Sequence, residues 1–524
     1  MNLLSKSIVL AMVLIVLVLV ADSPAFSSEI YYAQSSTGSN NGSSCTNAYS
    51  LSDSAHGINT PSVWTAGNTL HLCGTITAAP GAWVIASQGN GTSSSPITIK
   101  WESGAILQAP YFSSNGAINV SKSSYIVIDG GTNGILQNTL NGTKGGTCSG
   151  GACSYQQNSQ AINASGATNL TVQNLTIANI YVHSLASDTS IDQTQVVGIY
   201  DNGTATNWTI RNDTMHDIGW ATNVQFGSGS SNLTFSGNNI YNVDHGIAVG
   251  GPSATGSLNG LYVYGNNIHD YANWDTGSAD AYHHDGIHVW GYNDNGSNTI
   301  QGIQIYNNTF GGCIGADVTA HIFVEANQGG TKATYIYNNT LIDTCSGVDN
   351  DGLLTTGSPD GPYYIYNNTF MGSSSDVCVG TSSSPNVTFI NNVVTGCGTL
   401  ISVTTAGGFT SGGLNNNIYS AGGSNAFTYH GNYWNTSQFS KWQSATGQDS
   451  NSSYTSSAGL SSNGSPASTS PVVATGKNLA SLNIKALDSD IINIARPVTG
   501  LWTVGAYALT GITPPQNLTV VKAQ

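Results

Sequence analysis

A six-residue segment returns eight times along this chain, and it limits the possible folds more strongly than any other feature of the sequence. Successive copies lie 24 to 42 residues apart. The copies are VQNLTI (172–177), IRNDTM (210–215), FSGNNI (235–240), VYGNNI (263–268), IYNNTF (305–310), IYNNTL (336–341), IYNNTF (365–370) and FINNVV (389–394). Such self-similarity is typical of a solenoid, in which each unit buries its apolar face against its neighbours.

Within the repeat, apolar and polar side chains alternate with the period of a strand. In GIQIYNNTF, Ile303 and Ile305 alternate with Gln304 and Tyr306. The Asn-Asn step that follows predicts a tight corner, because asparagine tolerates the left-handed conformation and its side chain bonds nearby backbone. Asparagines at one corner are expected to stack into a ladder of amide hydrogen bonds. The fold predicted is all-β: a single-stranded, right-handed parallel β-helix with three short strands per coil, stacked about 4.8 Å apart.

The charge balance excludes one large class of partner. Eleven basic residues stand against 26 acidic ones, which gives a net charge of −15. Nucleic-acid binding is therefore not expected, because phosphate recognition needs a basic surface. Hydrophobic residues make up 39% of the chain, enough for a core, and 63 glycines indicate many turns. Bound cations could supply the positive charge that the side chains lack.

The N-terminus predicts the compartment. Lys6 precedes an apolar run (8–20) and small residues (21–25), so residues 1–28 are interpreted as a secretory signal peptide. No second run reaches the length of a membrane span, and we expect a secreted or cell-surface protein that is a monomer. Eight cysteines fit an oxidising destination. Their spacing suggests the disulfides Cys45–Cys73, Cys148–Cys153, Cys313–Cys345 and Cys378–Cys397, with free buried thiols as the alternative.

The two ends of the chain resemble a known superfamily. YYAQSSTGSNNGSS (31–44), WTAGNTLHLCGTI (64–76) and SSPITIKWESGAIL (94–107) look like the beginning of secreted pectate-lyase-like parallel β-helix proteins. WQSATGQDSNS (442–452) and RPVTGLWTVGAYAL (496–509) resemble their C-terminal closure. The resemblance implies the fold and the superfamily, whose members include lyases, hydrolases, epimerases and non-catalytic modules. The domains expected are an N-terminal cap (29–110), β-helix coils (111–430) and a loop-rich closure (431–524).

The longest interval between copies, from VYGNNI (263–268) to IYNNTF (305–310), contains the best candidate site. Four segments downstream of the corners align as DHGIAVGG (244–251), HDGIHVWG (284–291), TAHIFVEA (319–326) and NDGLLTTG (350–357). The alignment predicts inward side chains at Ile247, Ile287, Ile322 and Leu353. It predicts outward side chains at Ala248, His288, Phe323 and Leu354, and at Gly250, Trp290, Glu325 and Thr356. His245, Asp285 and Asp351 then share one column where the strands begin.

The column suggests acid/base chemistry on a sugar. HHDGIHV resembles the NTDG-type segment of polygalacturonases, whose catalytic aspartate would correspond to Asp285. The next coil departs from that family, since Thr319, Ala320 and His321 stand where it has paired aspartates. Adjacent coils would place His245 about 4.8 Å from Asp285 at the backbone, close enough for the carboxylate to orient the imidazole. Asp285 and Asp351 would lie about 9.6 Å apart, near the limit for inverting glycosidases.

The candidate residues can be grouped by role. Predicted catalytic residues are Asp285, His288, His245, Asp351 and Glu325; predicted substrate-binding residues are Trp290, His284, Asp244 and Arg211. Asp275 and Asp280, with Asp285, are candidate Ca²⁺ ligands because that ion prefers carboxylate oxygens. His284 and His288 are not expected to share a zinc ion, because four residues of strand span about 13 Å. The alternative for any one of these residues is that it only bonds turn amides.

Three functions remain open on the sequence. Hydrolysis of an extracellular polysaccharide needs only carboxylates and a histidine, and it fits the composition best. A Ca²⁺-assisted lyase is the second candidate, because β-elimination needs positive charge and Arg211 and Lys332 are the only basic residues between 204 and 400. The third is a non-catalytic carbohydrate-binding or adhesion module.

Overall fold

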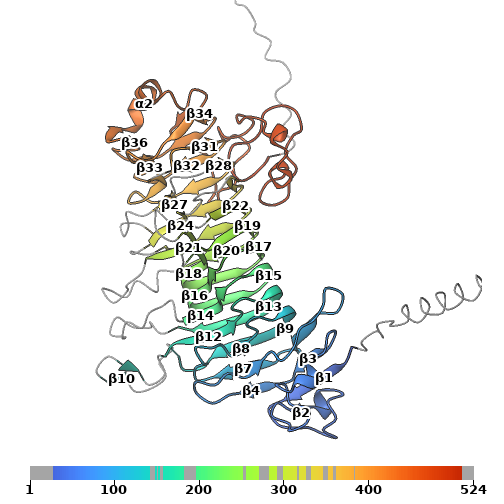
Figure 1. Ribbon diagram of the computed structural model, residues 1–524. Helices are drawn as coiled ribbons and strands as arrows, with labels where there is room; N and C mark the ends of the chain where they lie inside the picture. Colours follow the sequence, from blue (N-terminus) through green and yellow to red (C-terminus); the bar gives the residue numbers. More distant parts are fainter. Residues whose placement is uncertain are drawn as a thin grey trace, which may run out of the picture.

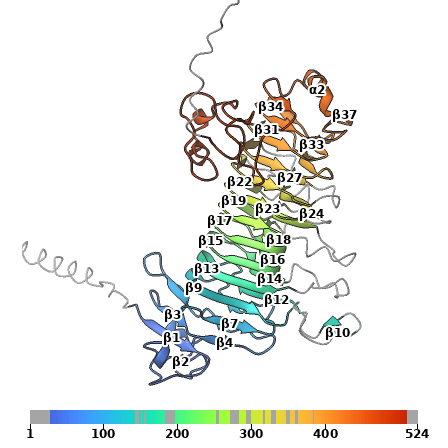
Figure 2. The same cartoon turned by 180° about the vertical axis from the view of Figure 1, so that it is seen from behind.

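The computed structural model describes most of the chain that follows the predicted signal peptide. The residues described are 27–141, 148–149, 152–153, 157–181, 196–251, 255–270, 283–291, 299–314, 318–325, 332–345, 352–357, 362–382 and 384–509. The predicted signal peptide, except for residues 27–28, lies outside them. The strands stack coil upon coil from the blue N-terminal end to the orange C-terminal end (Figures 1 and 2).

Three parallel sheets run along the axis of the coil. Sheet 1 contains β1 (Glu29–Ala33), β3 (Thr69–Leu72), β6 (Ile97–Trp101), the first halves of β9 (Ser124–Asn138) and β13 (Thr168–Ile180), β15 (Thr206–Arg211), β17 (Ser230–Ser236), β19 (Ser257–Tyr264), β22 (Thr299–Tyr306), β25 (Thr334–Tyr337), β28 (Tyr363–Tyr366), β31 (Val387–Ile390) and β34 (Phe409–Asn415). Sheet 2 contains β4 (Thr75–Thr77), β7 (Ile106–Ala109), the second halves of β9 and β13, the first halves of β16 (Thr214–Phe226) and β18 (Asn239–Gly250), β20 (Asn267–His269), β23 (Thr309–Gly311), β26 (Thr340–Ile342), β29 (Thr369–Met371), β32 (Val393–Thr395), β35 (Ile418–Ser420) and β38 (Ser453–Thr455).

Sheet 3 forms the remaining face. It contains β5 (Ile85–Ala86), β8 (Ile118–Asn119), β12 (Ser159–Asn163), β14 (Val196–Gly203), the second halves of β16 and β18, β21 (His284–Trp290), β24 (Val318–Val324), β27 (Gly352–Thr356), β30 (Val377–Thr381), β33 (Thr399–Val403) and β36 (Phe427–Tyr429). One coil therefore takes a strand from each sheet in turn, as β19, β20 and β21 do before β22 returns to sheet 1. The predicted right-handed parallel β-helix with three strands per coil is confirmed.

The interior is a column of stacked apolar side chains. Ile303 and Ile305 are fully buried, while Gln304 and Tyr306 on the same strand remain partly exposed. The register places Val263, Ile305, Ile336 and Ile365 in adjacent strands. Every second side chain of a strand thus points inward, and each sheet contributes one layer of side chains to the core.

The two corner positions of the repeat have different tasks. The first has a left-handed backbone, with φ between 51° and 61° at Asn174, Asn212, Asn307, Asn338, Asn367 and Asn391, and also at Asn416, which lies at one further corner after the eighth copy. Glycine takes that position in two copies. The second position is buried and forms a continuous chain of amide hydrogen bonds, 2.9 to 3.4 Å long, through Asn238, Asn266, Asn308, Asn339, Asn368, Asn392 and Asn417. This asparagine ladder, as we call it, confirms the stacking predicted from the repeat.

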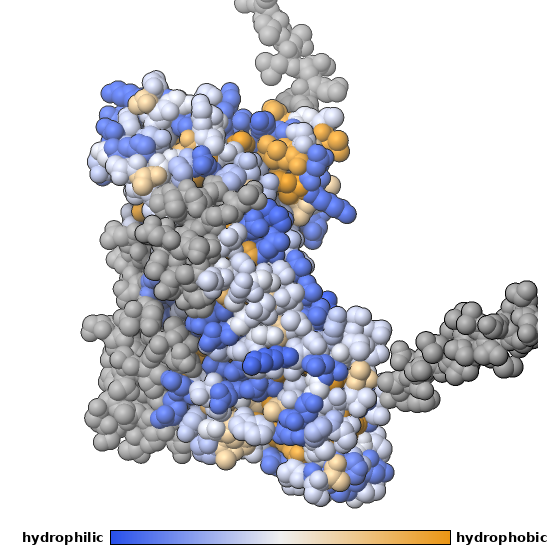
Figure 3. Space-filling view, viewed as in Figure 1, coloured by the Kyte–Doolittle hydropathy of each residue, from blue (hydrophilic) through white to orange (hydrophobic). Residues whose placement is uncertain are grey.

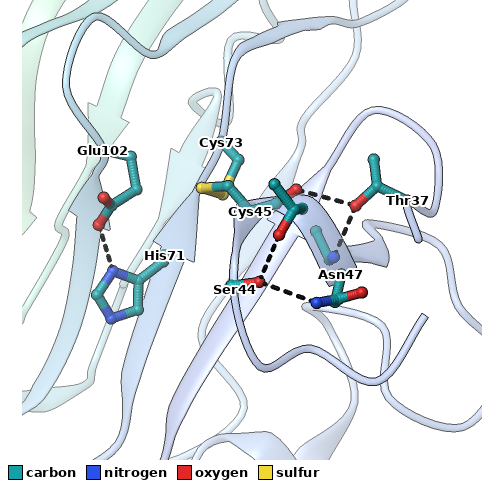
Figure 4. The surroundings of a disulfide bond; sticks show 9 residues. Thr37, Ser44, Cys45, Asn47, His71, Cys73 and Glu102 are labelled. Carbon is teal, nitrogen blue, oxygen red and sulfur yellow. Dashed lines mark hydrogen bonds and ion pairs between the residues drawn. A yellow bond between two sulfur atoms is a disulfide. The ribbon is translucent and has the colours of Figure 1, made fainter. Parts of the chain in front are cut away.

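Disulfides join neighbouring coils. Cys45–Cys73, Cys313–Cys345 and Cys378–Cys397 are formed, as the spacing predicted. Figure 4 shows the first of them, in which Cys45 is the first residue of η1 (Cys45–Asn47). Cys148 and Cys153 are paired across the antiparallel strands β10 (Cys148–Ser149) and β11 (Ala152–Cys153), but their side chains lie outside the described part of the chain. The three bonds fit an extracellular protein.

The last coils are closed by the C-terminal segment. The hairpin of β36 and β37 (Asn432–Trp434) leads through η5 (Thr436–Gln438) to the helix α2 (Phe439–Thr446), whose buried Trp442 stacks on Phe427. Residues 456–509 then run back over the asparagine corners, with short turns η6 (Ala480–Leu482) and η7 (Lys485–Asp488).

Apolar side chains gather on the surface of this C-terminal segment (Figure 3), among them the exposed Ile492, Val498 and Leu501. The remaining short elements are β2 (Tyr49–Ser50) and η2 (Pro61–Val63). Among the described residues, no helix is long and apolar enough to cross a membrane.

Asp449 ends the asparagine ladder inside this closure. Its buried carboxylate accepts hydrogen bonds from Trp442 Nε1 at 2.8 Å, from the Tyr419 hydroxyl at 3.1 Å and from Asn417 Nδ2 at 3.4 Å. Burial, only partly offset by these bonds, raises the pKa of Asp449 to about 6. The folded protein therefore holds this proton at a pH where the unfolded chain releases it.

The raised pKa of Asp449 predicts a pH-dependent stability. Its contribution is fully present below the unfolded pKa of about 4 and is lost as the pH rises through 6. Relative to Asp449→Asn, the free energy of unfolding of the unmodified protein should fall by about 2 to 3 kcal/mol between pH 4 and pH 7. Urea denaturation of both proteins across this range measures the difference, and a difference that does not change with pH would contradict the assignment.

Candidate active site

The candidate residues lie on sheet 3, where β18, β21 and β24 stack side by side. The register pairs His245 with Asp285, Ala248 with His288 and Gly250 with Trp290, as the alignment predicted. Glycine is required where these strands leave the corner. A Cβ on Gly246 would lie 2.4 Å from the backbone oxygen of Gly286, and one on Gly286 would lie 2.6 Å from that of His321. The close approach of the coils thus fixes both glycines of the DHG and HDG segments.

Four side chains converge above these strands, and we call His245, His283, Asp285 and His288 the histidine cluster. One donor atom from each lies within 4.8 Å of those of the other three. Asp285 Oδ2 faces the other three, at 3.4 Å from His245 Nε2, 3.0 Å from His283 Nε2 and 3.6 Å from His288 Nδ1. His288 Nδ1 and His245 Nε2 are 3.4 Å apart. Three imidazoles therefore face a single carboxylate oxygen.

Outer hydrogen bonds hold these groups in place. Asp244 Oδ1 accepts from His245 Nδ1, and Glu325 Oε1 lies 3.2 Å from His288 Nε2. The backbone N–H of Ala320 donates to Asp285 Oδ1 at 3.0 Å, which turns Oδ2 toward the imidazoles. Asp244 and Glu325 thus orient the rings of His245 and His288, and the other nitrogen of each ring faces the cluster.

The cluster is buried on most sides and open at one edge. His245, Asp285 and His288 are 1%, 0% and 6% exposed. The side chains of His283 and Glu325 are 42% and 40% exposed, so solvent reaches the group past them. The cluster is thus shared by neighbouring coils, but it is not the broad open trough that a purely outward-facing column would make.

Burial and charge act in opposite directions on the cluster. Burial alone would lower the pKa of His245, but the carboxylates of Asp244 and Asp285 raise it to about 9. Burial alone would raise the pKa of Asp285, but the hydrogen bonds from His245 and His283 lower it to about 2. Burial lowers the pKa of His288 despite its bond to Glu325. Asp285 is therefore a stable carboxylate and cannot give a proton to a substrate near neutral pH.

Aromatic rings surround the cluster along sheet 3. Trp220 stacks on His245 with ring centroids 4.1 Å apart, and Phe323 stacks on His288 at 4.8 Å. Trp290 meets Trp220 edge to face at 5.9 Å and lies 4.8 Å from His288. Trp290 and Phe323 are partly exposed, whereas Trp220 is buried. We call Trp220, Trp290 and Phe323 the aromatic shelf.

Other predicted residues lie apart or cannot be placed. His284 Nε2 lies 3.7 Å from Asp244 Oδ2, and both side chains are fully buried and so closed to a substrate. Arg211 is on sheet 1, where its Nη2 donates to Gln173 at 2.6 Å, and it does not join the cluster. Asp351, Asp275 and Asp280 lie outside the described residues, so the predicted Ca²⁺ site at the last two stays a prediction.

The alignment of the fourth segment is wrong by one residue. Ile322 pairs with Leu354, and Phe323 pairs with Thr355, so Leu354 points into the core and Thr356 is buried next to Val324. The pattern allowed both registers because Leu353 and Leu354 are both apolar. In the column of Asp285, the next coil has Ala320 and the coil after it has Gly352, where the alignment predicted Asp351.

The sequence reasoning missed His283 and Trp220. His283 precedes the strand, yet its ring lies 5.1 Å from that of His288. Trp220 belongs to a coil earlier than the first aligned segment, and the structure pairs it with His245. The HHD triplet was the available signal for His283, because its first histidine can fold back over the third residue at a corner.

Comparisons with known proteins give similarity in structure only. No family model matches the sequence, and no curated protein matches it. Among solved structures, the pectate lyase Pel9A is 14% identical, covering 92% of this chain and 96% of its own, with a TM-score of 0.40. The GH136 lacto-N-biosidase from Eubacterium ramulus is 12% identical over 75% of this chain and 64% of its own, with a TM-score of 0.42. The tailspike protein of E. coli bacteriophage HK620 is 9% identical over 70% and 71%, with a TM-score of 0.38.

Proposed function

We propose that this protein is a secreted enzyme that cleaves an extracellular polysaccharide at the histidine cluster. The observation that carries the proposal is the position of Glu325. Its carboxylate is partly exposed, is bonded to His288 of the cluster, and follows directly after the strand that carries Phe323 of the aromatic shelf. A carboxylate held by an imidazole at the edge of a buried polar group is suited to proton transfer.

The aromatic shelf supports a carbohydrate as the substrate. Trp290 and Phe323 present partly exposed rings, each 4.8 Å from the ring of His288. Aromatic faces with a few fixed polar groups are a common lining of small-molecule sites, and sugar rings pack well on them. A chain bound along sheet 3 would pass from the shelf to Glu325.

The geometry changes the preferred reaction. Hydrolysis by two carboxylates requires that both reach the glycosidic bond. Among the described residues around the cluster, Asp285 and Asp244 are buried and Glu325 alone is partly exposed. β-Elimination on a uronate needs one proton-transfer group and positive charge near the substrate carboxylate. Because the described residues around the cluster offer one exposed proton-transfer group and not two, we place elimination ahead of the hydrolysis that the composition favoured.

The test is an incubation of the purified protein with a panel of neutral and acidic polysaccharides. Ultraviolet absorbance from an unsaturated uronate is the expected result. New reducing ends without that absorbance would reject elimination and establish hydrolysis. If no polymer yields a product although the protein binds one of them, the protein is a carbohydrate-binding module and the proposal is wrong.

A further inference from the structure

We propose that the histidine cluster binds a divalent first-row transition-metal ion through His245, His283, Asp285 and His288. The sequence predicted Ca²⁺ at loop carboxylates and no zinc ion shared by His284 and His288. Binding of the ion is inferred from side-chain geometry alone. Only its use in catalysis rests on the proposed function.

The distances between donor atoms fit a coordination shell. Zn²⁺ lies about 2.0 to 2.2 Å from imidazole nitrogen and carboxylate oxygen, so donors around a tetrahedral ion are about 3.3 Å apart. The separations from Asp285 Oδ2 to the three imidazoles are 3.4, 3.0 and 3.6 Å. That between His288 and His245 is 3.4 Å. These four of the six separations are close to the spacing expected for an ion at their centre, and the two between His283 and the other imidazoles lie within 4.8 Å.

The partners of the imidazoles are those of metal ligands. A ligating histidine usually donates its other N–H to a carboxylate, which fixes the tautomer and the ring. His245 has Asp244 in that place and His288 has Glu325. Asp285 is held in the same way by the N–H of Ala320. Oδ2 of Asp285 is buried and faces the nitrogens of three imidazoles.

The donor set selects the class of ion. Ca²⁺ takes six to eight oxygen ligands and Mg²⁺ keeps several waters, whereas imidazole suits Zn²⁺ and its first-row neighbours. Three nitrogens and one oxygen therefore favour the second group. The open edge at His283 would give a substrate oxygen access to such an ion. The ion would supply the positive charge that a chain of net charge −15 lacks at this place.

The test measures metal binding without any substrate. The full mature protein is freed of metal by a chelator and titrated with Zn²⁺ by calorimetry, and with Co²⁺, whose visible spectrum reports the coordination geometry. One equivalent of each ion should bind, with Ca²⁺ much weaker. His283→Ala should weaken Zn²⁺ binding by at least about 100-fold, since loss of even an outer partner of a ligand costs about 10- to 100-fold. His283 is chosen because it lies outside the strand and is partly exposed, so the fold should survive its loss.

His269→Ala is the matched control. His269 also bonds an adjacent carboxylate, Asp270 Oδ2 at 2.6 Å, but on sheet 2 and outside the cluster. Its removal should leave Zn²⁺ binding unchanged, and circular dichroism should show both variants folded. Absence of Zn²⁺ and Co²⁺ binding, or binding that His283→Ala leaves unchanged, would overturn the inference. Zn²⁺ binding together with no product from any polysaccharide would uphold the metal site and reject the proposed function.

Discussion

Glu325→Gln is expected to lower the rate of polysaccharide cleavage by a factor of roughly 10² to 10⁴, the usual contribution of a positioned proton-transfer group. The amide keeps the shape of the carboxylate and can still accept the hydrogen bond from His288 Nε2, which is 3.2 Å long. It cannot take up or release a proton. The loss should therefore appear in kcat, with the fold and polysaccharide binding retained. Initial rates on the polymer that the panel identifies would measure it.

Glu102→Gln is the control for that substitution. Glu102 Oε1 also accepts from a buried histidine, His71 Nδ1 at 2.6 Å, and its side chain is 34% exposed, against 40% for Glu325. It lies beside the Cys45–Cys73 disulfide at the N-terminal end, far along the chain from the cluster (Figure 4). Glu102→Gln should cleave at the unmodified rate. Equal rates for Glu325→Gln and the unmodified protein would remove Glu325 from the chemistry.

Asn266→Ala is expected to destabilise the fold by about 4 kcal/mol, because it leaves several buried polar groups of the asparagine ladder without partners. Asn266 Oδ1 accepts from the backbone N–H of Asn238 at 3.0 Å and from its Nδ2 at 2.9 Å. Asn266 Nδ2 donates to the carbonyl oxygen of Phe235 at 3.0 Å and to Asn308 Oδ1 at 2.9 Å. Alanine restores none of these bonds. Urea denaturation followed by circular dichroism measures the loss.

The neighbouring asparagine provides the comparison. Asn267 is exposed, and its side chain makes one exposed bond to Asn239. Asn267→Ala should change the free energy of unfolding by no more than about 0.5 kcal/mol, as surface substitutions usually do. Two adjacent residues of one type would then differ by several kcal/mol. Similar effects for both would show that the ladder is not a major source of stability.

Most of the fold could be predicted from the repeat, because the alternation along its strand and the turn at its corner are local properties of the chain. Alternation such as Ile303–Gln304–Ile305–Tyr306 is set by strand geometry, and the Asn-Asn corner is set by the left-handed backbone and an amide that bonds the next coil. Each coil meets only its neighbours, so these local rules are sufficient to stack it. The predicted register of these strands was wrong only at Leu353 and Leu354, because the two are equally apolar.

The candidate site depended on distances that no local pattern contains. Sequence alignment could place His245 beside Asp285 because both begin a strand of the same sheet. It could not show that the corner turns His283 back over Asp285, or that Ala320 and Asp244 aim the donor atoms inward.

The sequence alone thus determined the coil and its corner asparagines, because both follow from spacing along the chain. It only suggested the three disulfides that the described residues form. Only the tertiary structure decided that Asp285 is a buried carboxylate among three imidazoles, and that Glu325 is the accessible one. Burial and the direction of a side chain depend on the coils above and below. They are fixed only when those coils have stacked.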